Sequence, residues 1–251
     1  MAEFKDHFSG LAANYAAFRP HYPGALYAEL AKLVDRHELA WDCGCGNGQA
    51  SVGLANHFDR VIATDPSAPQ IDKAIAADRV TYAVCPAEDA PVLKDDSVDL
   101  ILAAQAAHWF DLPKFYDEFR RVARPSAKLV LLSYRPTQVD DGAANAALQH
   151  FYTDGIGAYW PPERHHVDEG YANIPFPFPE EPGPDLTMEV SWPLDRLVAY
   201  AGTWSAVKEY RAKTGKDPLP GFRDALAEVW GNPDAPKRVF WPLTFRIGRV
   251  V

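Results

Sequence analysis

The chain lacks both a long apolar run and an excess of positive charge. No stretch approaches the roughly 18 consecutive apolar residues of a membrane-spanning helix, and the first residues have no apolar core like that of a secretion signal. Its 25 Lys and Arg are outnumbered by 34 Asp and Glu, so the formal net charge is −9. Nucleic-acid binding needs a basic face. We therefore expect neither a membrane nor a nucleic-acid partner.

Cysteine is also scarce. The three cysteines are odd in number and too few for a disulfide framework, so we expect a reducing, cytoplasmic location. Cys43 and Cys45 are separated by a single residue, which is the wrong spacing for a zinc-binding pair, and no second pair follows. The adjacent His165 and His166 also lack the spacing of a helical ligand set. We therefore predict no metal site.

What the chain does have is a glycine-rich turn between a strand and a helix. The stretch Trp-Asp-Cys-Gly-Cys-Gly-Asn-Gly-Gln, residues 41–49, follows an apolar approach and precedes a helical pattern at 50–57. Alternating glycines let the backbone turn sharply and lie close to a ligand. The start of the helix offers unpaired N–H groups to a carboxylate or phosphate. A cofactor-binding loop is therefore expected, with a tight turn that binds nothing as the plainer alternative.

Two kinds of ligand suit such a loop. The dinucleotide pattern is G-x-G-x-x-G, but here Gly48 comes one position early. Asp42 also stands just before the first glycine, Gly44, where its carboxylate would repel a pyrophosphate and attract a cationic amino group. The pattern therefore favours the methionine end of S-adenosylmethionine (SAM) over NAD.

A second acidic residue supports this interpretation. Residues 61–65 form a buried-type strand that ends in Asp65, about 20 residues beyond the glycines. At that spacing an acid at the end of the second strand reaches the ribose hydroxyls in folds of this kind. A carboxylate accepts hydrogen bonds from both hydroxyls, which explains the residue type.

With these residues the sequence resembles the class I SAM-dependent methyltransferases, in particular the branch of the type 11 methyltransferase domain and the trans-aconitate methyltransferases. The alternation of strands and helices favours a right-handed, doubly wound α/β sheet. The resemblance implies a Rossmann-like sheet of seven strands, mostly parallel with an antiparallel edge. We expect strands at 39–43, 61–65, 80–84, 98–103, 129–133, 188–192 and 239–250. Helices are expected from residue 23 to about 36, from 67 to about 77 with Ser67 as N-cap, and over 112–124, followed by a turn at 125–128.

We expect a single methyltransferase domain with four parts. They are an N-terminal helical lid (1–36), a SAM-binding core (37–135), a cap or substrate insertion (136–185), and C-terminal helices with edge strands (186–251). The insertion is rich in proline and aromatic residues. Aromatic residues at that density favour burial, so a cap is expected rather than a linker.

The resemblance implies the cofactor contacts. Tyr15 and Arg19 match a Y-x₃-RPxYP pattern that lies over the methionine end of SAM, where Arg19 would pair with the carboxylate. Ala87 and Glu88 would contact the adenine, with a solvated acidic turn as the alternative. The predicted cofactor-binding residues are Tyr15, Arg19, Asp42, Gly44, Gly46, Asp65, Pro66, Ala87, Glu88 and Gln105.

The acceptor side follows the fourth strand, where the chain reads Gln-Ala-Ala-His-Trp. Ligands of open parallel sheets bind at the carboxyl ends of the strands, so Gln105 and His108 are the catalytic candidates. His108 is a candidate base because an unperturbed imidazole titrates near pH 6.5, although a structural histidine is the plainer alternative. The predicted acceptor-binding residues are Trp109, Trp160, Arg164 and Trp204.

These residues predict a SAM-dependent methyltransferase that acts on a small molecule by in-line displacement and yields S-adenosylhomocysteine. A carboxylate acceptor needs no base, which fits the lack of an obvious catalytic dyad. Phenols, amines and carbon acids stay open, as does the choice between monomer and homodimer. An NAD-dependent oxidoreductase and a non-catalytic SAM-binding protein are the alternatives.

Overall fold

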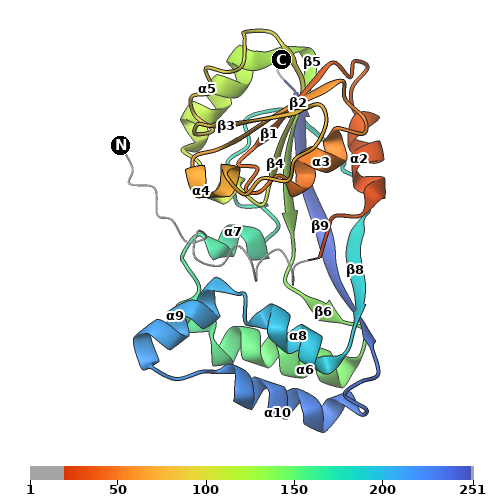
Figure 1. Ribbon diagram of the computed structural model, residues 1–251, viewed down its shortest axis with the longest axis vertical. Coiled ribbons are helices and arrows are strands. Elements are labelled where there is room, and N and C mark those ends of the chain that lie inside the picture. Colours follow the sequence, from red (N-terminus) through yellow and green to blue (C-terminus); the bar gives the residue numbers. More distant parts are fainter. Residues whose placement is uncertain (1–19, 250–251) are drawn as a thin grey trace.

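The computed structural model describes residues 20–249, which form a central sheet with a helical layer below it (Figure 1). The strand order is β3-β2-β1-β4-β5-β9-β6, with β7 and β8 also paired to β9. The strands are β1 (Leu39–Cys43), β2 (Arg60–Asp65), β3 (Val80–Val84), β4 (Val98–Ala104), β5 (Ala123–Tyr134), β6 (Gln138–Val139), β7 (Glu180–Glu181), β8 (Thr187–Trp192) and β9 (Lys237–Arg249).

The first five strands are parallel, and β9 runs antiparallel to β5. This confirms the expected Rossmann-like fold. The number of strands in the described part is nine rather than the predicted seven. The two unforeseen strands, β6 and β7, are only two residues long, too short to show a strand periodicity in the sequence.

Successive side chains of the central strands point to opposite faces of the sheet, and the core therefore has two clusters. Ala40, Leu100 and Leu102 pack on the side of α2 (Gly24–Ala31) and α3 (Gln49–Leu54). Their neighbours Trp41, Ile101 and Ala103 face α5 (Leu112–Val122). Successive side chains of a strand point to opposite faces, so one apolar run supplies both clusters. The sheet is thus covered on both sides.

One buried polar residue interrupts this run. Asp99 in β4 is 3% exposed. Its carboxylate accepts hydrogen bonds from the backbone N–H groups of Glu38 and Leu39, each at 2.9 Å, and pairs with Arg124 at 2.9 Å. These partners offset the cost of burying the charge. They also join the start of β1 to β4.

The lower layer combines two segments that are far apart in sequence. α6 (Gly142–His150) comes from the predicted insertion, and α8 (Leu194–Ala201), α9 (Ser205–Thr214) and α10 (Leu219–Trp230) come from the C-terminal part. α10 contacts both α6 and α8. The short α7 (Arg164–Asp168) lies between this layer and the sheet (Figure 1). No helix of residues 20–249 has the length and apolarity to cross a membrane.

Several helices end earlier than the sequence predicts, among them α3, which stops at Leu54 instead of residue 57. α2 stops at Ala31, whose carbonyl bonds the ring of His37 at 2.9 Å, instead of running to residue 36. α5 ends at Val122 rather than residue 124, because the chain continues directly into β5.

α4 (Ala68–Ile71) also ends early, since the sequence predicts a helix that continues to about residue 77. Beyond it, the N–H of Ile75 donates to the carbonyl of Asn47 at 3.0 Å, and the carbonyl of Ile75 accepts from the Tyr82 hydroxyl at 2.7 Å. These bonds hold the segment against the glycine loop instead of in a helix. Ser67 is at the predicted N-cap position, but its hydroxyl does not cap the helix.

One predicted turn is wrong, and one predicted segment lies mostly outside the described residues. The predicted turn at 125–128 belongs to β5, where Ser126 has a φ of 72° and the pairing with β4 shifts register. The predicted N-terminal lid, with Tyr15 and Arg19, lies outside the described residues except for its last part.

Candidate cofactor and acceptor site

The predicted cofactor residues gather at the carboxyl edge of the parallel strands. In the register of β1 and β2, Cys43 is opposite Thr64, so Asp42 and Asp65 lie near the same edge. β4 pairs with β1 on its other side and ends one residue before Gln105. In open parallel sheets this edge is where ligands bind.

The glycine loop crosses this edge in an unusual backbone conformation. Gly44 and Gly46 have φ angles of +71° and +55°, which side chains with a Cβ rarely adopt. A Cβ on Gly44 would be 2.5 Å from the Cβ of Ala106, so the loop packs tightly against the segment after β4. A Cβ on Gly46 would meet no described atom within 4 Å. The Gly46 side of the loop is therefore open to a ligand.

Asp42 carries a buried, unpartnered oxygen. The residue is 1% exposed. Its Oδ2 accepts a hydrogen bond from the Ser51 hydroxyl, whereas Oδ1 has no hydrogen-bond partner among the described residues. Burial raises the pKa of Asp42 to about 7; the Ser51 hydrogen bond opposes this shift and the charge of Asp65 adds to it. A cation placed beside Oδ1 would satisfy this oxygen.

Asp65 ties the end of β2 to the glycine loop. Oδ2 accepts a hydrogen bond from the Gly46 N–H, and Oδ1 accepts one from the Ser67 N–H, each at 2.9 Å. A carboxylate oxygen has two lone pairs, so these bonds are compatible with a further donor such as a ribose hydroxyl. Pro66 is exposed beside them. Asp65 thus shapes the loop, a structural role that the sequence did not reveal.

The predicted adenine contacts follow β3. Ala87 is buried, and Glu88 is half-buried. One oxygen of Glu88 accepts a hydrogen bond from the Asp111 N–H at 2.7 Å, at the start of α5. Glu88 therefore joins two loops of the site, and its proposed contact with the adenine amine would involve its second oxygen.

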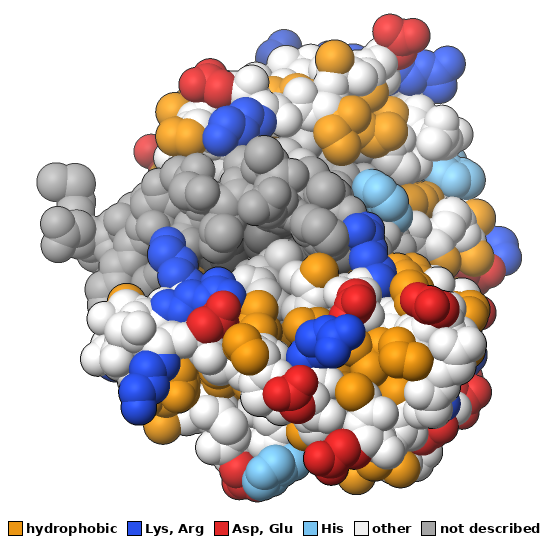
Figure 2. Space-filling view, turned by 60° about the horizontal axis from the view of Figure 1, so that its bottom comes forward, with side chains coloured by type: hydrophobic (Ala, Val, Ile, Leu, Met, Phe, Trp, Pro, Cys, Tyr) orange, Lys and Arg blue, Asp and Glu red, His pale blue; other side chains and the backbone are white. Residues whose placement is uncertain are grey.

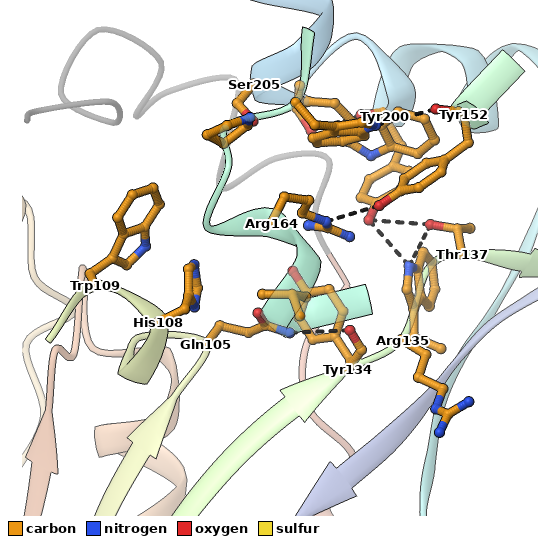
Figure 3. A pocket seen from close by; sticks show the side chains of 16 residues that line it. Gln105, His108, Trp109, Tyr134, Arg135, Thr137, Tyr152, Arg164, Tyr200 and Ser205 are labelled. Carbon is orange, nitrogen blue, oxygen red and sulfur yellow. Dashed lines mark hydrogen bonds between the residues drawn. The ribbon is translucent and has the colours of Figure 1, made fainter. Parts of the chain in front are cut away.

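A separate cavity of about 90 Å³ adjoins Gln105 and extends toward the lower layer (Figure 3). Its walls come from the ends of β4 and β5, from the insertion, and from the C-terminal part. Seven aromatic residues line it: Trp109, Tyr134, Tyr152, Trp160, Tyr200, Trp204 and Trp241. The other lining residues are Gln105, His108, Arg135, Thr137, Pro161, Arg164, Val167, Thr203 and Ser205. No acidic side chain is among these described lining residues.

The structure therefore brings six predicted residues into one cavity. They are Gln105, His108, Trp109, Trp160, Arg164 and Trp204. Their roles stay predictions. Sequence reasoning missed the wall formed by Thr137, Tyr200 and Trp241. There the Trp241 indole donates to the Thr137 hydroxyl at 2.7 Å and to the Tyr200 hydroxyl at 3.1 Å. These partners are 41 and 104 residues from Trp241 in sequence, and no local pattern signals such a contact.

Arg164 brings positive charge into the aromatic cavity. Its Nε donates to the Tyr152 hydroxyl at 2.9 Å and to Asp168 at 3.0 Å. The guanidinium carbon lies 4.8 Å from the ring centroid of Trp160, within the range of a cation–π interaction. In Figure 3 the guanidinium points into the cavity. Its hydrogen bonds to described residues come from Nε, so the two terminal nitrogens can serve as donors to a ligand.

Gln105 and His108 stand beside each other at the end of β4. Gln105 has a left-handed φ of 55°, and its amide nitrogen donates to the Tyr134 carbonyl at 3.4 Å. His108 Nδ1 is 2.8 Å from the Tyr171 hydroxyl. Burial, with smaller contributions from the charges of Arg164 and His166, lowers the pKa of His108 to about 3. The imidazole is therefore neutral at physiological pH and a weak base, which argues against the predicted role as general base.

Within residues 20–249 no group of three or more His, Cys, Asp or Glu side chains is arranged to hold a metal ion. The adjacent histidines have other partners: His165 bonds the Pro162 carbonyl, and His166 bonds the side chain of Asn173 at 2.6 Å. On the described part of the face in Figure 2, acidic and basic side chains are interspersed with apolar ones rather than gathered into a basic area.

Comparison with known proteins agrees with this geometry. A family model described as a methyltransferase domain matches residues 41–131. A Dictyostelium discoideum protein described as a methyltransferase is 34% identical over 240 residues, which cover 94% of this chain and 91% of that protein. The chain belongs to the class I SAM-dependent methyltransferases. A solved structure from Anaeromyxobacter dehalogenans, described as a type II methyltransferase, is 50% identical, with a TM-score of 0.87 over 92% of this chain and 98% of that one.

SAM is the cofactor of this methyltransferase, and the carboxyl edge fits it. Asp42 offers a buried acceptor to an amino group, Gly46 leaves the loop open, and Asp65 lies at the end of β2. Membership of this family argues against the two alternatives, an NAD-dependent oxidoreductase and a non-catalytic SAM-binding protein. The branch of trans-aconitate methyltransferases stays a prediction.

Proposed function

We propose that this methyltransferase methylates an oxygen of a small, flat carboxylic acid held in the aromatic cavity. The single observation that carries the proposal is the Arg164 guanidinium. It lies against Trp160 in a cavity whose described lining has no acidic side chain.

The cofactor half of the reaction depends on the carboxyl edge of the sheet. SAM supplies an electrophilic methyl group on a cationic sulfur. Asp42 would bind the amino group with its buried Oδ1, and Asp65 would accept hydrogen bonds from the ribose while its bond to Gly46 keeps the loop in shape. Both are fixed before the cofactor binds, since backbone or hydroxyl donors already hold them.

The acceptor half depends on Arg164. A guanidinium forms paired hydrogen bonds with a carboxylate, and these bonds are charge-assisted. The surrounding rings exclude water and offer flat surfaces for stacking. A carboxylate is already ionised at neutral pH, so the chain need only bind it, orient it and keep water out. This matches the weak basicity of His108.

The same features disfavour other acceptors. A protonated amine would bring a second positive charge beside Arg164, and the nearby carboxylate of Asp168 already binds Arg164 and the Tyr152 hydroxyl. A phenol would need a base, and the neutral His108 is a poor one. An acid with an unsaturated or aromatic body fits the walls best. We further propose that the enzyme acts in the cytoplasm as one domain, either a monomer or a homodimer.

The test is S-adenosylhomocysteine release over a panel of acceptors. The panel pairs flat acids, such as benzoate, cinnamate and trans-aconitate, with their amides and with amines of the same shape. We expect turnover with acids alone. Turnover confined to amines or phenols would refute the proposal.

A pair of variants tests whether Arg164 binds the acid. Arg164→Met should raise the KM for the acid by at least about tenfold while cofactor affinity is unchanged, because it removes a charge-assisted pair. Arg120→Met is the matched control, since Arg120 also lies over an aromatic ring, that of Phe178, but away from the cavity. Equal effects of the two variants would contradict the role of Arg164.

A further inference from the structure

His108 and Tyr171 form a pair at the edge of the acceptor cavity that the proposed function does not yet use. His108 Nδ1 lies 2.8 Å from the Tyr171 hydroxyl oxygen, and the two residues are 63 positions apart. Tyr171 is fully buried. His108 lines the cavity, and Figure 3 shows its ring between Trp109 and Gln105.

The direction of this hydrogen bond follows from burial. Desolvation raises the pKa of Tyr171 above its usual range, so the hydroxyl keeps its proton. A buried hydroxyl proton needs an acceptor, and among the described residues the nearby acceptor is Nδ1 of His108. Because the imidazole is neutral, an accepting Nδ1 leaves the ring proton on Nε2.

Tyr171 is held in a conformation that its side chain does not favour. Its φ is 65°, in the left-handed region. The N–H of Tyr171 donates to the His166 carbonyl at 2.7 Å, and its carbonyl accepts from Arg246 at 2.8 Å. Strained backbone persists where surrounding contacts impose it, and such positions concentrate at functional sites.

We propose that Tyr171 is a positioning residue that fixes the neutral tautomer of His108 with its proton on Nε2. His108 then donates a hydrogen bond to an oxygen of the acid in the cavity. This rests on the proposed function, because it assigns His108 a partner on the carboxylate. Among the described residues, the hydrogen-bond partner of the His108 ring is the Tyr171 hydroxyl at Nδ1, and the proposal assigns Nε2 to the acid.

The arrangement suits a carboxylate that must stay nucleophilic. Arg164 supplies the charge that binds the acid, and a second full charge on His108 would draw more electron density from the reacting oxygen. A neutral N–H instead fixes the orientation of the carboxylate with a weaker hydrogen bond. Burial, and to a smaller extent the charges of Arg164 and His166, disfavours the charged imidazole and so keeps the donor neutral.

The decisive measurement is nitrogen NMR of the full chain with labelled histidine, because it needs no acceptor. One imidazole, absent from His108→Gln, should show the Nε2–H tautomer without titrating between about pH 5.5 and about pH 8, since an unperturbed histidine would titrate there. In Tyr171→Phe, which lacks only the hydroxyl, the same ring should show both tautomers. Tyr116→Phe is the control, because it removes another buried hydroxyl, one bonded to the Pro175 carbonyl.

Activity then separates positioning from folding. With an acid that is turned over, Tyr171→Phe should lower kcat about tenfold without changing SAM affinity, and it should have no added effect in His108→Gln. A wild-type His108 with its proton on Nδ1, or a Tyr171→Phe spectrum identical to wild type, would overturn the proposal. If no acid is methylated, the proposed function fails while the NMR result still decides the tautomer.

Discussion

Ser51 donates its hydroxyl proton to Oδ2 of Asp42, and the other oxygen of this buried carboxylate is left without a partner in the described part of the chain. The pair sits where β1 ends and α3 begins. It leaves one oriented acceptor for a cation. The raised pKa of Asp42 makes both cofactor affinity and folding stability depend on pH.

Cofactor affinity should fall in acid. Burial raises the pKa of Asp42 to about 7 in the free protein, and an amino group binds its ionised form. Below about pH 7, protonation of Asp42 competes with the ligand, so the affinity for S-adenosylhomocysteine should drop about tenfold per pH unit. Calorimetry at about pH 5.5, 6.5 and 7.5 measures this slope, within the range where an α-amino group is protonated. A flat profile would mean that Asp42 does not pair with the amino group.

The same residue should destabilise the protein without cofactor. Its pKa is higher in the folded chain than in the unfolded one, so the folded state binds more protons across the interval between them. Stability therefore falls as pH rises through this window toward about 7. Asp42→Asn should raise the free energy of unfolding at about pH 8 by on the order of 3 kcal/mol. It should also abolish the increase in melting temperature on adding S-adenosylhomocysteine.

The control for this variant is Asp78→Asn, which changes an exposed carboxylate between α4 and β3. It should leave both the stability and the response to ligand unchanged. A destabilised Asp42→Asn protein would show that the carboxylate is better solvated than its burial indicates.

Asp65→Ala should weaken the binding of S-adenosylhomocysteine by more than about 100-fold, because it removes the ribose acceptor and releases the Gly46 N–H that shapes the loop. Titration calorimetry measures the loss. Asp65→Asn keeps one acceptor for the loop and should lose less. Asp78→Ala again serves as the comparison, and equal affinities for Asp65→Ala and wild type would sink the assignment.

Much of the fold was predictable because the sheet is built from short apolar runs with clear ends. β1 and β3 have the predicted bounds, Leu39–Cys43 and Val80–Val84. The early end of α4 was not predictable, since it depends on bonds from Ile75 to Asn47 and from Tyr82 to Ile75. Such contacts replace the helix without leaving a signal in its own sequence.

The candidate site likewise contains some residues that could be predicted from the sequence and others that could not. Asp42 and Asp65 could be placed because they end strands of a sheet whose parallel order brings those ends together. Tyr171 could not, because its relation to His108 spans 63 residues and depends on how the insertion folds back over β5 and the segment after β4. The structure also changes the expected chemistry of His108, since burial, which no sequence pattern measures, lowers its pKa.

Two glycines in the left-handed backbone region can separate an effect on ligand binding from an effect on folding. Gly46 (φ +55°) in the loop and Gly215 (φ +68°) at the end of α9 each have no described atom within 4 Å of an added Cβ. Alanine at either position should cost about 1–2 kcal/mol of stability, the usual penalty for a side chain in the left-handed region. Gly46→Ala should in addition abolish the binding of S-adenosylhomocysteine, because its Cβ occupies the open side of the loop, while Gly215→Ala should bind normally. Thermal unfolding with and without ligand compares the pair. Normal binding by Gly46→Ala would show that the cofactor does not approach the loop at this residue.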